Sequence, residues 1–213
     1  KSGASWIDAD TLFVGTDFGK GSLTNSGYPR IAKRWKRGTP LTAAETVYEG
    51  QVEDVWDAAF ADTTPGFERQ GIMRGITFYS SEMFLLQDGK QVKIDKPDSA
   101  HGNLHREWLL LELRDDWAVG GKTWLAGSLL ATRLDDFMAG KREFEALFTP
   151  TDRSSLAGYS PTRHHIIVNE LDNVKNRVYV WTPGADGWKR EPLAGRPEFG
   201  SVSVSAVDAR DSD

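Results

Sequence analysis

The chain has 213 residues and a formal net charge of −5. This length is enough to bury a large core without covalent cross-links, and the negative field repels polyanions. Because there is no cysteine, disulfides, cysteine-bound zinc, iron–sulfur clusters and a thiol nucleophile are excluded. No apolar run approaches the roughly 18 residues of a membrane-spanning helix. We therefore expect neither nucleic acid nor a membrane as a partner.

The composition favours short β-strands joined by tight turns. Eight Trp, ten Phe and 21 Gly are spread along the chain. Aromatic residues are enriched in strands, and glycine in the turns between them. Helix should be scarce, with at most one turn at 135–140.

A period of about 50 residues organises these strands. Turn glycines recur at Gly38, Gly89, Gly140 and Gly187, which are 51, 51 and 47 residues apart. Each turn should join an apolar strand to a more polar strand that faces solvent. The expected pairs are, in chain order, 30–35 with 45–49, 82–87 with 90–94, 131–138 with 141–148, and 176–181 with 188–193. The two-residue Asp88-Gly89 turn is the clearest hairpin signal.

Further strands are expected before each pair, at 11–18, at 52–60 with 71–78, at 107–114 with 123–131, and at 164–171. Three or four strands per unit predict an all-β fold, a β-propeller with about four blades. Residues 1–213 then form one partial propeller domain, with blades at about 1–50, 51–100, 101–150 and 151–200. The first strand of a further blade is expected at 201–209. A β-sandwich also fits short, regularly spaced strands and remains the alternative fold.

No complete catalytic motif is evident. Ser160 occupies the place of a nucleophile in Gly-Tyr-Ser-Pro-Thr, but Pro161 has no backbone N–H for an oxyanion hole, and Thr162 replaces the second glycine. We assign no catalytic residue in this chain.

The histidines do not predict a metal site or a cofactor. His164 and His165 are neighbours on an expected strand, so their side chains should point to opposite faces. His101 and His105, with Glu107 nearby, have the spacing of helical metal ligands but lie in an expected loop. We expect no metal and no cofactor.

Charged groups elsewhere have plain structural interpretations. Acidic pairs at 8/10, 115/116 and 135/136 are expected in exposed turns rather than in a glycosidase site. The Gly-Gly-Lys-Thr-Trp string at 120–124 resembles the end of a sialidase Asp-box, but Val119 replaces the expected aspartate. The basic run at 30–37 surrounds Trp35 and is expected to be a solvated strand rather than a nucleic-acid site.

The segment Ser5–Leu41 carries the most specific resemblance. It reads SWIDADTLFVGTDFGKGSLTNSGYPRIAKRWKRGTPL and is similar to the propeller domain of bacterial serine peptidases of the prolyl oligopeptidase family. The later segments REWLLLELRDDW and DDFMAGKREFEALFTP follow in the same order, so the resemblance covers essentially the whole chain.

The resemblance implies a seven-bladed propeller, of which about four blades would lie in this chain, above an α/β-hydrolase domain. It implies a parent serine endopeptidase that cleaves short peptides after proline, with the propeller screening the active site. The hydrolase domain of that parent would be the main partner, and short proline-containing peptides would be substrates. We expect the chain to be a processed or truncated piece, inert alone, from the bacterial cytoplasm or periplasm.

The loop from Gly19 to Arg30 is the expected functional surface, since long loops on rigid scaffolds often carry recognition. We assign Tyr28 and Arg30 to it as substrate-gating or interdomain residues, with Arg30 able to pair with a peptide carboxylate or an acid of the catalytic domain. The alternative is a loop that only packs against the next blade.

Two further expectations remain open. A free-standing carbohydrate-active or carbohydrate-binding propeller is the alternative function. A partial propeller also leaves blade edges uncovered, so the chain is expected to associate with itself through those edges.

Overall fold

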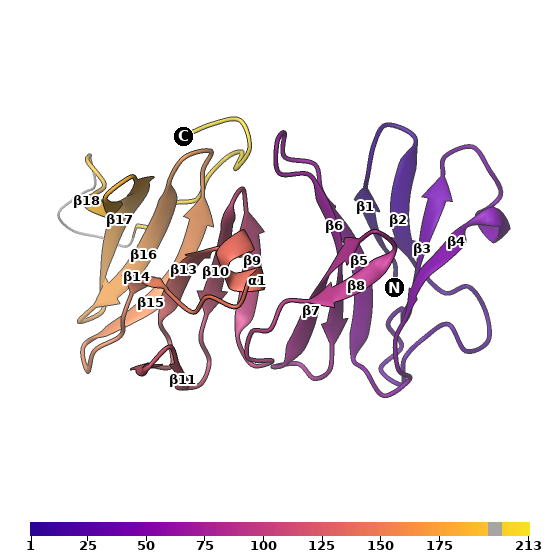
Figure 1. The fold of residues 1–213 in the computed structure, drawn as a ribbon, viewed down its shortest axis with the longest axis horizontal. Coiled ribbons are helices and arrows are strands. Elements are labelled where there is room, and N and C mark those ends of the chain that lie inside the picture. Colours follow the sequence, from indigo (N-terminus) through magenta and orange to yellow (C-terminus); the bar gives the residue numbers. More distant parts are fainter. Residues whose placement is uncertain (196–201) are drawn as a thin grey trace. The chain divides into compact units, whose positions relative to one another are not determined.

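The computed structural model describes residues 1–195 and 202–213, which form two compact units, Lys1–His101 and Gly102–Asp213. Strands dominate both units, so the all-β prediction is confirmed. Each unit carries four-stranded antiparallel sheets whose strands neighbour one another in chain order (Figure 1). None of the helices in the described residues is long and apolar enough to cross a membrane.

The first unit contains two sheets. The first sheet comprises β1 (Gly3–Trp6), β2 (Thr11–Gly15), β3 (Ile31–Lys36) and β4 (Glu45–Glu49), with a 3-10 turn at Leu41–Ala43. The second sheet comprises β5 (Trp56–Asp62), β6 (Arg69–Gly75), β7 (Ser81–Gln87) and β8 (Lys90–Lys93).

The second unit repeats this arrangement with one insertion. Its first sheet comprises β9 (His101–His105), β10 (Trp108–Glu112), β13 (Leu129–Arg133) and β14 (Glu145–Phe148). A hairpin of β11 (Trp117–Val119) and β12 (Lys122–Trp124) is inserted after β10, and the helix α1 (Leu134–Met138) follows β13. Its second sheet comprises β15 (Ser154–Pro161), β16 (Ile166–Asp172), β17 (Lys175–Gly184) and β18 (Gly187–Pro192).

The turn glycines follow the predicted period, with two differences in detail. Asp88 and Gly89 both have positive φ, at 49° and 74°, which confirms the two-residue hairpin between β7 and β8. Gly140 follows α1 rather than a strand, and its N–H bonds to the Phe137 carbonyl as a helix C-terminal glycine does. Gly187 begins β18, because the turn itself is Ala185-Asp186.

The outer strands are mostly polar, as predicted. Side chains of β4, β8 and β18 are largely exposed or half-exposed. The prediction is wrong for β14, since Leu147 and Phe148 are buried in the core of the second unit.

The strand expected at 201–209 is not formed over the described part, 202–209, and residue 201 lies outside the described residues. Instead, the Val204 N–H donates to Asn169 Oδ1 over 3.1 Å, and Asn169 Nδ2 donates to the Val204 carbonyl over 2.9 Å. A side-chain amide of β16 thus takes the place of a neighbouring strand.

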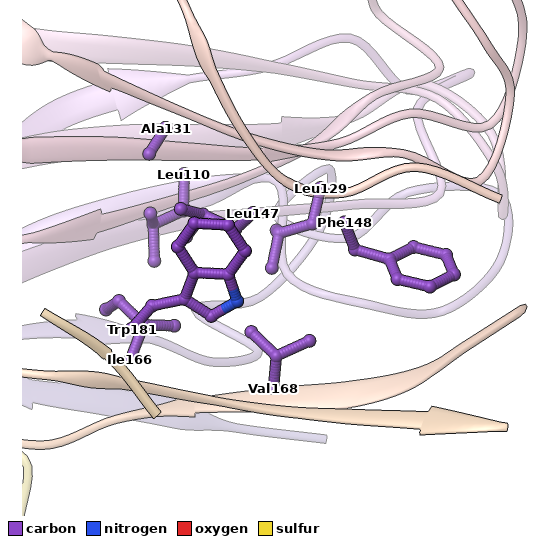
Figure 2. Packing of buried hydrophobic residues seen from close by; sticks show 8 residues of the cluster. All are labelled: Leu110, Leu129, Ala131, Leu147, Phe148, Ile166, Val168 and Trp181. Atoms are coloured by element: carbon purple, nitrogen blue, oxygen red, sulfur yellow. The ribbon is translucent and has the colours of Figure 1, made fainter. Parts of the chain in front are cut away.

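Apolar side chains from both sheets make the core of the second unit. Figure 2 shows Trp181 of the last sheet among leucines of the preceding one. The cluster comprises Leu110, Leu129, Ala131, Leu147, Phe148, Ile166, Val168 and Trp181. Since each residue is nearly or fully buried, the two sheets of this unit are held together mainly by apolar contact.

A buried lysine organises the end of the first unit. Lys96 is 4% exposed, and its Nζ donates to the carbonyls of Ser81, Ala100 and Pro97 over 2.6, 2.8 and 3.2 Å. Burial lowers the pKa of Lys96 to about 8. The ammonium therefore donates to three carbonyls at once, of which the Pro97 carbonyl also accepts the Ala100 N–H over 3.0 Å.

We expect Lys96→Met to lower the free energy of unfolding by about 2–4 kcal/mol, because the Ser81, Ala100 and Pro97 carbonyls lose the ammonium as a donor. Urea unfolding followed by circular dichroism measures this change. Lys90→Met on the exposed strand β8 is the control and should shift stability by less than about 0.5 kcal/mol. Equal stability of both variants would contradict the proposed role of Lys96.

Candidate functional site

The long loop between β2 and β3 is held by its own polar side chains. Asp17 Oδ1 accepts the Gly19 N–H over 2.8 Å and the Ser22 hydroxyl over 3.0 Å. Ser22 Oγ in turn accepts the Phe18 N–H over 2.8 Å. The first half of the loop is therefore a closed turn rather than an open strap.

Arg30 anchors the second half of this loop. Its Nε donates to the Gly21 carbonyl and its Nη1 to the Gly50 carbonyl, both over 2.7 Å. Nη1 also lies 2.8 Å from Glu49 Oε1. The guanidinium is thus engaged within the first unit, which supports the packing interpretation of the loop more than a free anion-binding arginine.

Tyr28 lines a largely apolar pocket of about 660 Å³ in the first unit. The pocket is walled by β1, by β5 and by aromatic side chains that include Phe13, Trp56, Phe60 and Phe78. Lys1 Nζ lies 3.4 Å from the centre of the Tyr28 ring. Of the two predicted site residues, Tyr28 therefore lines the pocket, whereas Arg30 holds the loop through hydrogen bonds to backbone carbonyls.

An unpaired buried carboxylate lies beside this loop. Asp57 is 3% exposed, and neither carboxylate oxygen has a hydrogen-bond partner among the described residues. Its backbone N–H donates to the Pro29 carbonyl over 2.9 Å. A Cβ at Gly50 would meet the Asp57 carboxylate, so this carboxylate fits only because residue 50 is glycine.

Charged residues from three elements surround Asp57. Asp54 forms a bidentate pair with Arg74 at 3.0 Å, and Arg74 also contacts Glu82 at 3.0 Å. Burial, reinforced by the Asp54 charge, raises the pKa of Asp57 to about 7, although Arg74 and Arg30 oppose this shift. Burial and the Asp57 charge likewise raise the pKa of the Tyr48 hydroxyl to about 12.

Sequence reasoning missed Asp57. The available signal was an aspartate in the apolar stretch Val-Trp-Asp-Ala-Ala-Phe at 55–60. A lone charge in a strand of this kind must be paired, exposed or neutral when buried. Its burial next to Gly50 could not be foreseen, since contact between the two sheets of the first unit brings these positions together.

The histidine predictions need correction. His101 and His105 lie at the two ends of strand β9 and not in a loop, which places their Cα atoms about 13 Å apart. His164 and His165 lie in the β15–β16 turn and not on a strand, and their Nδ1 atoms bond to Asp213 and Thr182 respectively, each over 2.7 Å. Within the described residues, no group of three His, Asp or Glu side chains could hold a metal ion.

The other candidate residues have structural contacts. Ser160 lies in β15, and its Oγ accepts the Ala206 N–H over 2.9 Å. Asp8 accepts the N–H groups of Asp10 and Thr11 in a turn, and Asp116 accepts the Ala126 N–H. The pair at 135/136 lies in the first turn of α1 rather than in an exposed loop. Acidic side chains in the first turn of a helix interact favourably with the helix dipole.

The basic side chains at 30–37 are engaged by contacts within the first unit. Arg37 pairs with Asp10 at 2.9 Å, Arg34 donates to Gln70 over 2.9 Å, and Lys33 lies 4.7 Å from the centre of the Phe18 ring. These contacts support a structural strand over a nucleic-acid surface. The Gly-Gly pair at 120–121 is the turn of the β11–β12 hairpin.

Replacement of Asp57 should change how stability depends on pH. The unfolded chain releases the Asp57 proton near pH 4, whereas the folded chain keeps it until about pH 7. The stability contributed by the neutral carboxyl is therefore full below about pH 4 and is lost as the pH rises to 7.

As the pH rises from 5 to 8, we expect the free energy of unfolding of Asp57→Asn to increase relative to that of the unsubstituted chain, by on the order of 2 kcal/mol. Urea unfolding at a series of pH values measures this difference. Asp88→Asn, in an exposed turn, is the matched control. If both variants track the unsubstituted chain across this range, Asp57 does not titrate as described.

The comparisons with known proteins identify relatives of the whole chain. No protein-family model matches the sequence. The chain is 27% identical over 218 residues to the uncharacterized peptidase y4nA of Sinorhizobium fredii, covering 98% of this chain and 30% of that protein. It is 25% identical over 203 residues to the uncharacterized peptidase RP174 of Rickettsia prowazekii, covering 91% and 28%.

Solved structures give the same answer. A post-proline cleaving enzyme from Rickettsia typhi matches with a TM-score of 0.82 and 26% identity, over 93% of this chain and 30% of that one. A prolyl endopeptidase structure matches with a TM-score of 0.62 at 12% identity, which supports the fold alone. The chain thus spans about 30% of the length of the relatives it matches. These matches confirm the resemblance seen in the sequence: the chain is related to the N-terminal part of peptidases of the prolyl oligopeptidase family.

Proposed function

We propose that this chain is the propeller portion of a prolyl oligopeptidase-type serine endopeptidase that cleaves short peptides after proline. In this proposal the chain docks an α/β-hydrolase catalytic domain and restricts access to its active site. The observation that carries the proposal is the match to the Rickettsia typhi post-proline cleaving enzyme over 93% of this chain. The carbohydrate-binding alternative has no comparable support.

The sheets supply the scaffold that such a role requires. We interpret each four-stranded sheet as one blade of a seven-bladed ring, at about 1–50, 51–100, 101–150 and 151–200. Four meandering antiparallel sheets in series support this interpretation. Apart from the β2–β3 loop and the insertion after β10, the connections between neighbouring strands are short, which favours a rigid screen over a mobile lid.

Within this scaffold, we assign Tyr28 and Arg30 different parts. Arg30 holds the loop by bonding the Gly21 and Gly50 carbonyls. Tyr28 lines the apolar pocket beside β1 and β5. A loop fixed at its base and lined by an aromatic side chain suits contact with a short peptide.

The first test is peptidase activity with a Gly-Pro chromogenic peptide. Residues 1–213 alone should show no turnover, whereas a chimera with these residues in place of the matched segment of the Rickettsia typhi enzyme should cleave it. The chimera should leave a folded protein intact. Tyr28→Ala in the chimera should change KM by about threefold or more with little change in kcat, because it removes a binding contact.

The matched control is the chimera with Phe78→Ser. This substitution changes the polarity of the same pocket at an exposed ring. Turnover by residues 1–213 alone that a serine-directed inhibitor abolishes would refute the proposal. A correctly folded chimera that cleaves folded proteins as fast as peptides would refute the screening role.

We also propose that residues 1–213 associate with themselves through uncovered sheet edges, since open strand edges pair readily with other chains. Light scattering should show a mass that rises with concentration. Addition of a charged residue at an exposed edge position, as in Gln91→Lys on β8, should lower that mass. A constant monomer mass at high concentration would contradict this expectation.

A further inference from the structure

The second unit contains a small pocket that has no part in the function proposed above. It has a volume of about 240 Å³ and lies between the β9–β10 turn and the β15–β16 turn. The end of β17 and the start of β18 complete its wall. Side chains from two different sheets therefore meet around one space.

Two tryptophans form the apolar side of the pocket. Trp108 begins β10 and Trp188 belongs to β18, and their ring centres lie 4.7 Å apart with the planes at 61°. Ile166, which is 1% exposed, lines the same space. Because both indoles also pack against the core cluster, the apolar side is preorganised rather than assembled by a ligand.

The opposite side carries an unpaired cation. The Arg163 side chain is exposed and makes no hydrogen bond or ion pair with the described residues. Its backbone N–H donates to the Ser212 carbonyl over 2.8 Å, which fixes the turn that presents it. His165 lies next to it, with its Nδ1 2.7 Å from the Thr182 hydroxyl oxygen, and its Nε2 has no partner among the described residues.

The remaining charges around the pocket are compensated. Arg106 lies 4.0 Å from Glu107, and His164 lies 2.7 Å from Asp213. Among the described residues that line the pocket, Arg163 is thus a cation without a counter-charge, in a chain whose net charge is −5. This arrangement favours an anionic ligand group on one side and a flat apolar group on the other.

We propose that this pocket binds the C-terminal residue of a short peptide, with the carboxylate at Arg163 and the side chain against Trp108 and Trp188. A guanidinium binds a carboxylate through two parallel hydrogen bonds. The volume of about 240 Å³ is below the roughly 300–1,000 Å³ of pockets for drug-sized ligands, so it suits a single residue. That the ligand is a peptide rests on the proposed function, whereas the anion site does not.

An acidic side chain of an adjoining domain offers the same carboxylate chemistry, and three peptides separate the two sources. The probes are N-acetyl-Gly-Pro-Phe with a free carboxylate, the same peptide as its C-terminal amide, and N-acetyl-Gly-Pro-Glu as its C-terminal amide. Binding to residues 1–213 is measured by titration calorimetry and by chemical-shift changes of tryptophan indole N–H signals. We expect the free acid to bind about tenfold more tightly than either amide.

Variants of the exposed arginine test the assignment without disturbing the core. Arg163→Gln should weaken binding of the free acid about tenfold and abolish its advantage over the amide, whereas Arg163→Lys should keep part of it. Arg153→Gln removes the same charge from the opposite end of β15 and should leave binding unchanged.

Equal affinity for the acid and its amide, or an unchanged preference in Arg163→Gln, would overturn the proposal. Equal affinity for the glutamate amide and the free acid would assign the pocket to an acidic side chain and overturn the C-terminal assignment. These binding measurements need no peptidase activity. They can therefore succeed even if the chimera fails to cleave the Gly-Pro peptide that tests the proposed function.

Discussion

Face-to-face burial between paired sheets is the constraint on which both units depend. A four-stranded antiparallel sheet has two faces, and a short meander of this kind cannot bury either face by itself. In the second unit the solution is apolar: Leu110 and Leu129 from one sheet meet Val168 and Trp181 from the next. The polar strands β4, β8 and β18 each form an edge of their sheet, and most of their side chains lie outside these buried faces.

The first unit meets the same constraint with more polar contacts. The Ala61 N–H donates to Ser5 Oγ across the two sheets over 2.9 Å, and Arg34 reaches Gln70. The Asp57 carboxylate is buried at this junction without a hydrogen-bond partner among the described residues. A buried carboxylate of this kind costs free energy when it is ionised, so it does not add stability in that state. It fits only because residue 50 is glycine.

The elements predicted from the sequence succeed where local chemistry decides. Asp88-Gly89 forms the expected hairpin because a two-residue turn with positive φ at both positions matches the twist of the strands β7 and β8. The prediction is wrong where tertiary contacts compete with the local pattern. Residues 202–209 alternate like a strand, yet the amide of Asn169 and the hydroxyl of Ser160 take their backbone groups. His101 and His105 lie in a strand because β10 offers them a partner, which no local signal reveals.

The candidate site was predictable only in part, for the same reason. The composition of the 19–30 loop indicated Tyr28 and Arg30 together, but their side chains take different directions. Tyr28 lines a pocket, whereas Arg30 donates to the carbonyls of Gly21 and Gly50. The Arg163 pocket joins turns that are about 58 residues apart in the chain, so its residues share no local motif. Repetition of one sheet along the chain places equivalent turns near one another. Each junction between sheets can therefore carry a different side-chain set on a nearly constant backbone, which lets one junction hold a buried carboxyl and another present an unpaired arginine.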